Sequence, residues 1–166
     1  MDTFYQTTGF HFAVHFSAGD RGSVDVRFQS VAGLDSTLDI ETIKEGGENR
    51  FEHVIPTRRR FGPLVLKRGL IGPLSSPVAN WLKKTFEGEP FDAATGNENF
   101  QVIDTVIIDL LGEDHQPLMS WTVTNVWPRS WKIAEMNAER SEVLIETLEL
   151  NYNRLIFSEL KSFNTK

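Results

Sequence analysis

Short runs in which apolar and polar residues alternate constrain the fold of this chain more than any other feature of its sequence. Residues 10–16, FHFAVHF, carry an apolar residue at every second position, and residues 24–31, VDVRFQSV, repeat the pattern after the turn-like segment SAGDRGS. This spacing is typical of a half-buried β-strand. It predicts that the two runs pair as an antiparallel hairpin.

Further apolar runs extend the same interpretation along the chain. They predict five more strands, at residues 38–43, 51–55, 64–68, 100–111 and 118–127. Gly46-Gly47 is expected to end the first of these, and Pro56 is expected to stop the second. The fourth is apolar on both faces, which predicts a central or covered strand.

One segment has the period of a helix instead. Ser76 is a suitable N-cap, Pro77 fits the first turn, and Val78, Trp81 and Leu82 follow at helical spacing. The pattern predicts a short helix at about 76–87, closed by a following glycine. The spacing in residues 141–152, SEVLIETLELNY, fits a helix and a strand equally. We therefore expect a single, mostly β domain over residues 1–166, built as a barrel or a sandwich with one helix.

Composition excludes several classes of protein. The chain has no cysteine, so disulfides, thiolate nucleophiles and cysteine-ligated metal centres are excluded. Its longest apolar runs fall far short of the ~20 residues that span a bilayer, and its first residues lack the pattern of a secretory signal. The formal net charge of −6 argues against a general affinity for nucleic acid.

The charges are separated along the sequence. Residues 44–68 contain seven lysines and arginines against three acids, whereas residues 85–128 contain eight acids and no lysine or arginine. If the fold preserves this separation, one end of the molecule suits contact with the other end of a second copy. We expect an ion-pair contact between these two stretches of neighbouring subunits.

No arrangement of residues predicts catalysis or metal binding. His11 and His15 lie four apart in an expected strand, which separates them by ~13 Å, too far to share one ion. The run EGGEN at 45–49 lacks the ending of a phosphate loop, and the acidic pairs lie in turn-like segments. The arginine run at 58–60 fits a solvated face, a protein contact or, less well, a nucleic-acid contact.

Two longer stretches together are similar to a known family. Residues 43–70, IKEGGENRFEHVIPTRRRFGPLVLKRGL, resemble one signature of contractile-tail tube proteins: a glycine loop, a basic corner and an apolar strand ending in Lys-Arg-Gly. Residues 123–155 resemble the second, Asn-x-Trp-Pro-x-x-Trp followed by Glu-Val-x-Ile-Glu-Thr-Leu-Glu-Leu. The resemblance covers about residues 10–155. The chain departs from the family in a longer tail at about 156–166.

The resemblance implies a fold and an assembly. Family members form a small β-barrel of two packed antiparallel sheets flanked by a helix, six copies make a ring, and rings stack into a tube. It implies that residues 141–152 form a strand. It also implies that the two signatures supply an assembly interface: Glu45, Gly46, Gly47, Arg58, Arg59, Arg60, Lys67, Arg68, Gly69, Trp127 and Trp131.

The same resemblance implies partners and a location. The tube is surrounded by a sheath, meets baseplate and spike proteins, and carries DNA or effector protein as cargo. No cofactor, catalytic residue or membrane insertion of this chain is expected. Assembly in the bacterial cytoplasm, into a phage tail or an injection-system particle, would follow.

Three other interpretations of the chain remain open on the sequence. It could be a tube-initiator ring at the baseplate. It could be a secreted ring protein that chaperones effectors, as in type VI secretion. From a different class, it could be a monomeric β-barrel that binds a small ligand in an interior cavity.

Overall fold

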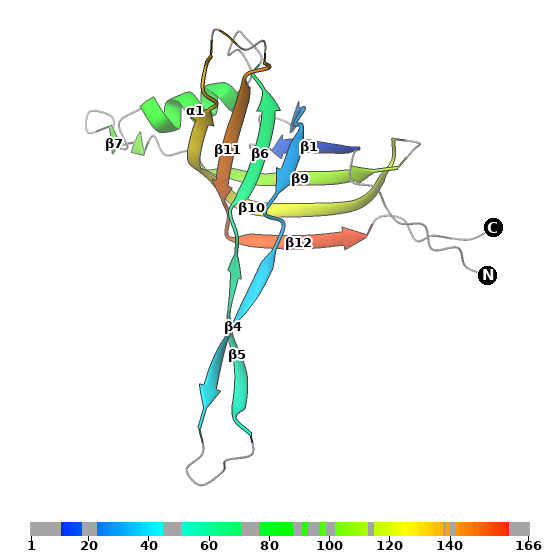
Figure 1. Cartoon of the computed structure of the whole chain (residues 1–166), viewed down its shortest axis with the longest axis vertical. Coiled ribbons are helices and arrows are strands. Elements are labelled where there is room, and N and C mark those ends of the chain that lie inside the picture. The colour runs from blue at the N-terminus through cyan, green and yellow to red at the C-terminus, as the bar shows by residue number, and fades with distance from the viewer. Residues whose placement is uncertain are drawn as a thin grey trace, which may run out of the picture.

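The computed structural model of the chain describes residues 11–17, 23–44, 51–70, 77–87, 91–92, 97–98, 102–112, 115–137, 139 and 142–159. In chain order the elements are β1 (Phe12–Ser17), β2 (Ser23–Val26), β3 (Ser30–Ala32), β4 (Ser36–Ile43), β5 (His53–Phe61), β6 (Leu64–Gly69), α1 (Pro77–Glu87), β7 (Phe91–Asp92), β8 (Asn97–Glu98), β9 (Ile103–Leu111), β10 (Pro117–Ile133), β11 (Ile145–Asn151) and β12 (Arg154–Glu159). Figure 1 shows them in one view.

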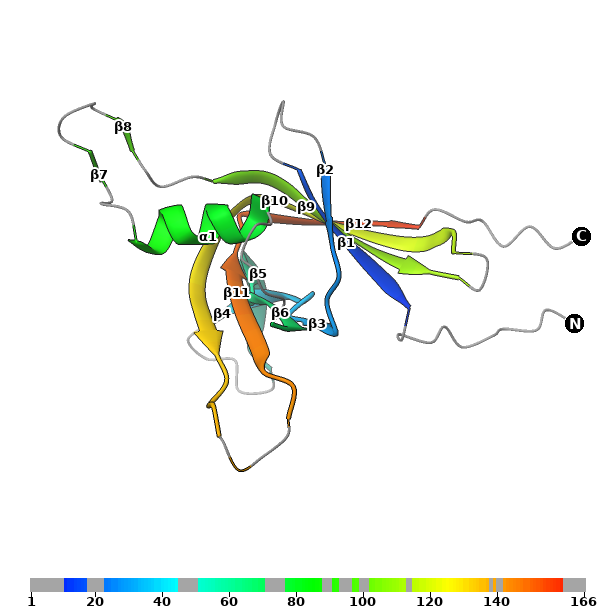
Figure 2. The same cartoon turned by 90° about the horizontal axis from the view of Figure 1, so that it is seen from above.

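The body of the molecule consists of two sheets that share the long strand β10. The strands follow the order β2-β1-β9-β10-β11-β6-β3, with β12 also paired to β10. Residues 117–126 of β10 pair with β9 and residues 119–124 also with β12, whereas residues 127–133 pair with β11. At the junction Asn125 has a φ of 53°, which asparagine tolerates better than most residues. The strand therefore bends out of one sheet and into the other, as Figure 2 shows.

The expected fold class is confirmed: mostly β, two packed antiparallel sheets and one helix. The two sheets enclose the hydrophobic core. Among the described residues the strand path ends at β2 on one side and at β3 on the other, so these strands do not close into a barrel. Two smaller pairs, β4-β5 and β7-β8, lie outside this path.

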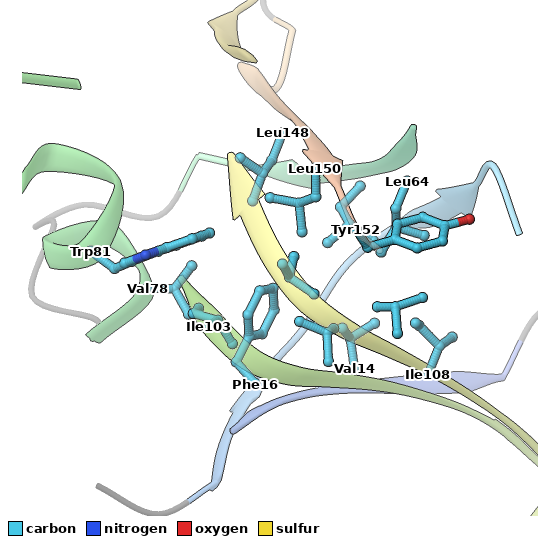
Figure 3. Packing of buried hydrophobic residues seen from close by; sticks show 14 of the residues in the cluster. Val14, Phe16, Leu64, Val78, Trp81, Ile103, Ile108, Leu148, Leu150 and Tyr152 are labelled. Carbon is cyan, nitrogen blue, oxygen red and sulfur yellow. The ribbon is translucent and has the colours of Figure 1, made fainter. Parts of the chain in front are cut away.

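The core explains why alternating runs fold this way. In β1 the side chains of Val14 and Phe16 are buried, while His15 lies on the other face, as the alternation predicts. Figure 3 shows them packed with side chains from β9 and β11. The buried cluster comprises Val14, Phe16, Leu64, Leu66, Val78, Trp81, Leu82, Ile103, Val106, Ile108, Val123, Val126, Leu148, Leu150 and Tyr152.

The predicted helix is confirmed as α1. Val78, Trp81 and Leu82 are buried, and in Figure 3 Val78 and Trp81 point from the helix toward Ile103. The Thr85 hydroxyl donates a hydrogen bond to the Trp81 carbonyl at 2.9 Å, one turn earlier. The expected cap, Ser76, lies outside the described residues.

The alternation over residues 24–31 predicts one strand, and this prediction is wrong. β2 pairs with β1 in the first sheet, whereas β3 pairs with β6 in the second. The alternation continues across the break because Phe28, between the two strands, packs against the same core as Phe16, with their ring centroids 6.1 Å apart.

The prediction that Pro56 stops a strand is also wrong. β5 continues through Pro56 to Phe61, and Pro56 is paired with Ile40 beside a register shift. In a two-stranded sheet each strand is an edge, so the missing N–H of a proline is tolerated. The arginine run consequently lies within a strand.

The segment that spacing left ambiguous is a strand, as the family resemblance implies. β11 pairs with β10 on one side and β6 on the other. Its burial alternates along its length, with Glu146, Leu148 and Leu150 buried. The next strand, β12, covers residues 154–159 and adds an edge beside β10.

A tight corner joins β3 to β4. Gly33 has a φ of 86°, and a Cβ there would lie 2.0 Å from the carbonyl oxygen of Pro63, so glycine is required. The Tyr152 hydroxyl donates a hydrogen bond to the Gly33 carbonyl at 3.2 Å. Burial, and then the charge of Asp35, raise the pKa of Tyr152 to about 12.

We predict that the free energy of unfolding falls between pH 10 and pH 12 because of Tyr152. In this window an unfolded phenol, with a pKa of ~10, has ionised, while the folded Tyr152 still holds its proton. The stability that the raised pKa provides is complete below pH 10 and is lost as the pH approaches 12. Denaturant unfolding at pH 10, 11 and 12 measures this. Tyr152→Phe should flatten the pH dependence, and an unchanged slope would contradict the assignment.

Candidate assembly interface

The strands β4 and β5 form a hairpin that extends away from the two-sheet body, as Figure 1 shows. Its register pairs Ser36 with Phe61 near the body and Ile43 with His53 toward the tip. Near the register shift, the Arg60 guanidinium donates to the Asp39 carboxylate at 2.5 Å, and the Thr57 hydroxyl donates to the Asp39 carbonyl at 3.2 Å. These bonds fix the two strands against each other.

The hairpin exposes large apolar side chains on both of its faces. A two-stranded hairpin is at best marginally stable in water, and apolar patches on a surface mark contact sites. The exposed residues of this kind on the hairpin, with adjoining Phe51, are Leu38, Ile40, Ile43, Phe51, Val54 and Ile55. This concentration indicates that the hairpin is covered by another protein surface in its working state.

The predicted interface residues fall into three groups. Arg58, Arg59 and Arg60 are exposed on β5, and Lys67 is exposed on β6. The remaining described members lie on the body, partly or fully buried: Arg68, Gly69, Trp127 and Trp131. Glu45, Gly46 and Gly47 lie outside the described residues.

Arg68 does not share the exposed surface of the other arginines. Its side chain is 10% exposed, and its guanidinium donates to Glu146, itself 2% exposed, at 2.5 Å. The other oxygen of Glu146 accepts a hydrogen bond from the Trp131 indole at 2.5 Å. Phe28 lies under the Arg68 guanidinium, 5.8 Å from it, and the Trp131 ring stacks with Phe86 of α1. Two predicted interface residues therefore join β6, β10, β11 and the helix inside one chain.

The acidic stretch is only partly available to a neighbour. Asp109 accepts a hydrogen bond from the Ser120 hydroxyl at 2.6 Å and lies 3.3 Å from the His15 imidazole. Glu87 pairs with Lys83 one turn earlier in α1. Of the acids of the stretch whose side chains are described, Glu87 and Asp104 are exposed and Asp109 is partly buried. The expected contact between the basic and acidic stretches remains a prediction.

The four histidines lie at three separate places in the structure. His15 faces Asp109, while the His11 ring meets His115 edge to face with centroids 4.6 Å apart. His53 lies beside Phe51 near the tip of the hairpin. Among the described residues no three metal-ligating side chains come together. Within the same residues, no helix combines the length and apolar character needed to cross a bilayer.

The exposed apolar surface of the hairpin is a candidate functional feature that sequence reasoning missed. The sequence of residues 38–43 and 51–55 predicts strands, but it does not indicate whether those strands lie in the core or outside it. One signal was available: these runs place apolar residues on both faces next to glycine and charged residues, without the continuous apolar character of a covered strand. The structure places them outside the core.

Comparison with known proteins places the chain among tube proteins. The family model of the T4-like virus tail tube protein gp19 matches residues 8–156. The chain is similar, with a TM-score of 0.84 and 28% identity, to a chain in the six-fold symmetrised baseplate of the anti-feeding prophage, covering 96% of this chain and 100% of that one. No curated protein sequence is a significant match.

More distant structures share the fold. A chain of the sheath–tube complex of an extracellular contractile injection system, PVC, has a TM-score of 0.73 at 21% identity, over 94% of this chain and 93% of that one. An Hcp protein has a TM-score of 0.57 at 8% identity, over 89% and 92% of the two chains.

Proposed function

This chain belongs to the T4-like virus tail tube protein family, and we propose that six copies of it form a ring and that such rings stack into the tube of a contractile particle. As a member of this family it is a structural subunit of a tube. The proposal that copies form rings and that rings stack rests on one observation in particular. The β4-β5 hairpin leaves the body with apolar side chains on both faces, which suits a subunit whose surfaces are completed by copies of itself.

Six-fold symmetry and the outer partners extend the proposal. The similar baseplate chain belongs to a six-fold assembly, and a second similar chain belongs to a sheath–tube complex. By analogy the ring would have six members, with a sheath around it and a baseplate and spike at one end. DNA or effector protein would pass through the lumen, and assembly would take place in the bacterial cytoplasm. Because the family is structural, we assign no catalytic role to the chain.

The experiment that tests this function is imaging. Negative-stain micrographs of the concentrated protein, and of the native particle, should show rings of six-fold symmetry or stacked tubes. A protein that stays monomeric at high concentration and is absent from the inner tube of the particle would refute the proposal.

A ring at the baseplate end of the tube is a second candidate function. Of the structures named above, the baseplate chain has both the higher identity and the higher TM-score, and it is covered over its full length. Antibody labelling of intact particles separates the two functions. Label along the whole tube indicates the main subunit, whereas label confined to the baseplate end indicates an initiator ring.

A further inference from the structure

The pairing of β1 with β9 brings together two histidines that are far apart in the sequence. His11 directly precedes β1, and its carbonyl accepts a hydrogen bond from the Leu111 N–H, at the end of β9, at 2.9 Å. The turn that follows β9 carries His115. Figure 2 shows the start of β1 and the adjoining ends of β9 and β10 at the same end of the first sheet. The two imidazole rings meet there edge to face, with their centroids 4.6 Å apart.

The backbone of the turn fixes the place of the His115 ring. The Gly112 N–H donates to the Gln116 carbonyl at 2.9 Å, and the His115 N–H donates to the Gly112 carbonyl at 3.1 Å. His115 has a φ of 58°, a left-handed conformation that is uncommon outside glycine, although histidine adopts it more often than most residues. Backbone strain of this kind is concentrated at functional sites. The turn therefore holds this imidazole against His11 at some cost in free energy.

The nitrogens of both rings are available as ligands. Within the described part of the chain, neither imidazole of the pair has a hydrogen bond or an ion pair. His11 is partly buried and His115 is exposed. The third histidine of the sheet, His15, differs because it faces Asp109 at 3.3 Å, and Asp109 also accepts a hydrogen bond from the Ser120 hydroxyl. Asp109 is therefore not counted as a partner of the pair.

Two imidazoles at this separation can share one metal ion. An ion that is bound ~2.0–2.1 Å from a ring nitrogen lies ~3 Å from the centroid of that ring. Two such rings at ~90° around the ion have centroids ~4.5 Å apart, whereas a tetrahedral angle separates them by ~5 Å. The observed 4.6 Å fits the smaller angle, which is that of square-planar and tetragonal Cu²⁺ or Ni²⁺ sites.

We propose that His11 and His115 form a two-histidine site for a divalent transition-metal ion, with Cu²⁺ bound most tightly. Cu²⁺ stands at the top of the affinity order for nitrogen ligands among the divalent first-row metals. Water completes the coordination, since no group of three metal-ligating side chains occurs among the described residues. A bound ion ties the start of β1 to the turn between β9 and β10. The site does not depend on the proposed tube function.

Titration of the metal-free full chain with CuCl₂ at neutral pH tests the site. One Cu²⁺ per chain should bind, and its electron paramagnetic resonance spectrum should show coupling to two imidazole nitrogens. Two variants remove one ligand each. His11→Phe keeps an aromatic ring for the edge-to-face contact, and His115→Asn keeps a residue that tolerates a positive φ. Each should weaken Cu²⁺ binding roughly 100-fold, because two ligands on one scaffold bind an ion far more tightly than one.

The matched control is His53→Phe, because the His53 ring also contacts an aromatic ring, Phe51, but lies near the tip of the hairpin. This variant should bind Cu²⁺ as the unsubstituted chain does. If the chain binds no stoichiometric Cu²⁺, or if either ligand variant keeps the affinity, the two histidines form a ring contact only. An equal loss of affinity in His53→Phe would also contradict the site. The titration uses the dispersed subunit, so its result is independent of tube formation.

Thermal unfolding gives a second, independent readout. An ion that binds only the folded chain raises the midpoint of unfolding, by roughly 5 °C at about a hundredfold excess over its Kd. Cu²⁺ should therefore raise the midpoint of the unsubstituted chain and of His53→Phe, but not that of His11→Phe. An equal rise in all three proteins would mean that the ion binds elsewhere on the chain, and the proposed site would be wrong.

Discussion

Replacing Leu38, Ile40 and Val54 together by serine is expected to abolish tube formation while leaving the body of the molecule folded. All three side chains are half or more exposed on the hairpin and lie outside the core cluster. Fully burying an apolar side chain of this size contributes about 1.5–3 kcal/mol. Because these three are already partly buried on the hairpin, the triple variant should lose roughly 3–5 kcal/mol per contact. That corresponds to a rise of about 100- to 5000-fold in the protein concentration needed for growth. Sedimentation of tubes across a concentration series measures it.

The controls for this variant separate assembly from folding. Circular dichroism and the unfolding midpoint of the dispersed subunit should match those of the unsubstituted protein, because the substitutions leave every core residue in place. Val102→Ser removes an apolar side chain of comparable exposure just before β9, away from the hairpin, and should assemble normally. If the triple variant builds tubes at the usual concentration, these three side chains do not form a contact surface. If Val102→Ser is equally impaired, the effect is not specific to the hairpin.

The elements that sequence patterns predicted well are those in which local spacing and burial agree. β1 shows this agreement, since Val14 and Phe16 are buried and Phe12, on the same face, packs partly buried against the core. The helix α1 shows it too, because Val78, Trp81 and Leu82 form one apolar face that packs on the sheets. In both cases the sequence carries the periodicity that the packing requires.

The predicted ends of strands were wrong where pairing with a distant strand overrides a local signal in the sequence. Pro56 ends a strand in most sheets, but in the hairpin its lost hydrogen bond falls at an edge. β10 likewise runs through Pro128 to Ile133, beyond the predicted end at 127, with a register shift between Pro128 and Ser130. A bulge of this kind adds twist and lets one strand take part in two sheets. No local sequence pattern predicts such a shared strand.

The candidate interface was predictable only in part. The family resemblance drew attention to residues 58–69, yet it did not distinguish the exposed arginines of β5 from Arg68. The partner that buries Arg68 is Glu146, which lies 78 residues away in sequence. A basic run therefore looks uniform in the sequence, while the pairing of β6 with β11 takes one of its members into the interior.

That interior pair leads to the second large expected effect: Glu146→Ala should lower the free energy of unfolding by about 3–5 kcal/mol. The substitution leaves the Arg68 guanidinium, a charge at a site only 8% exposed, without its carboxylate. It also removes the acceptor of the Trp131 indole N–H and opens a void beside Leu82 of α1. Urea unfolding of the dispersed subunit, with the slope compared between proteins, gives the measurement.

The strand itself provides the matched control. Glu149 also lies on β11 and pairs with a lysine, Lys132, at 3.1 Å, but the lysine side chain is 66% exposed. An exposed pair contributes about 0–1 kcal/mol, so Glu149→Ala should cost far less than Glu146→Ala. Arg68→Met/Glu146→Leu should recover much of the lost stability, because neither charge then remains buried without a partner. If Glu146→Ala and Glu149→Ala lower the free energy of unfolding equally, Glu146 contributes no more than an exposed residue of the strand. The helix would then be held to the sheets by its apolar face alone.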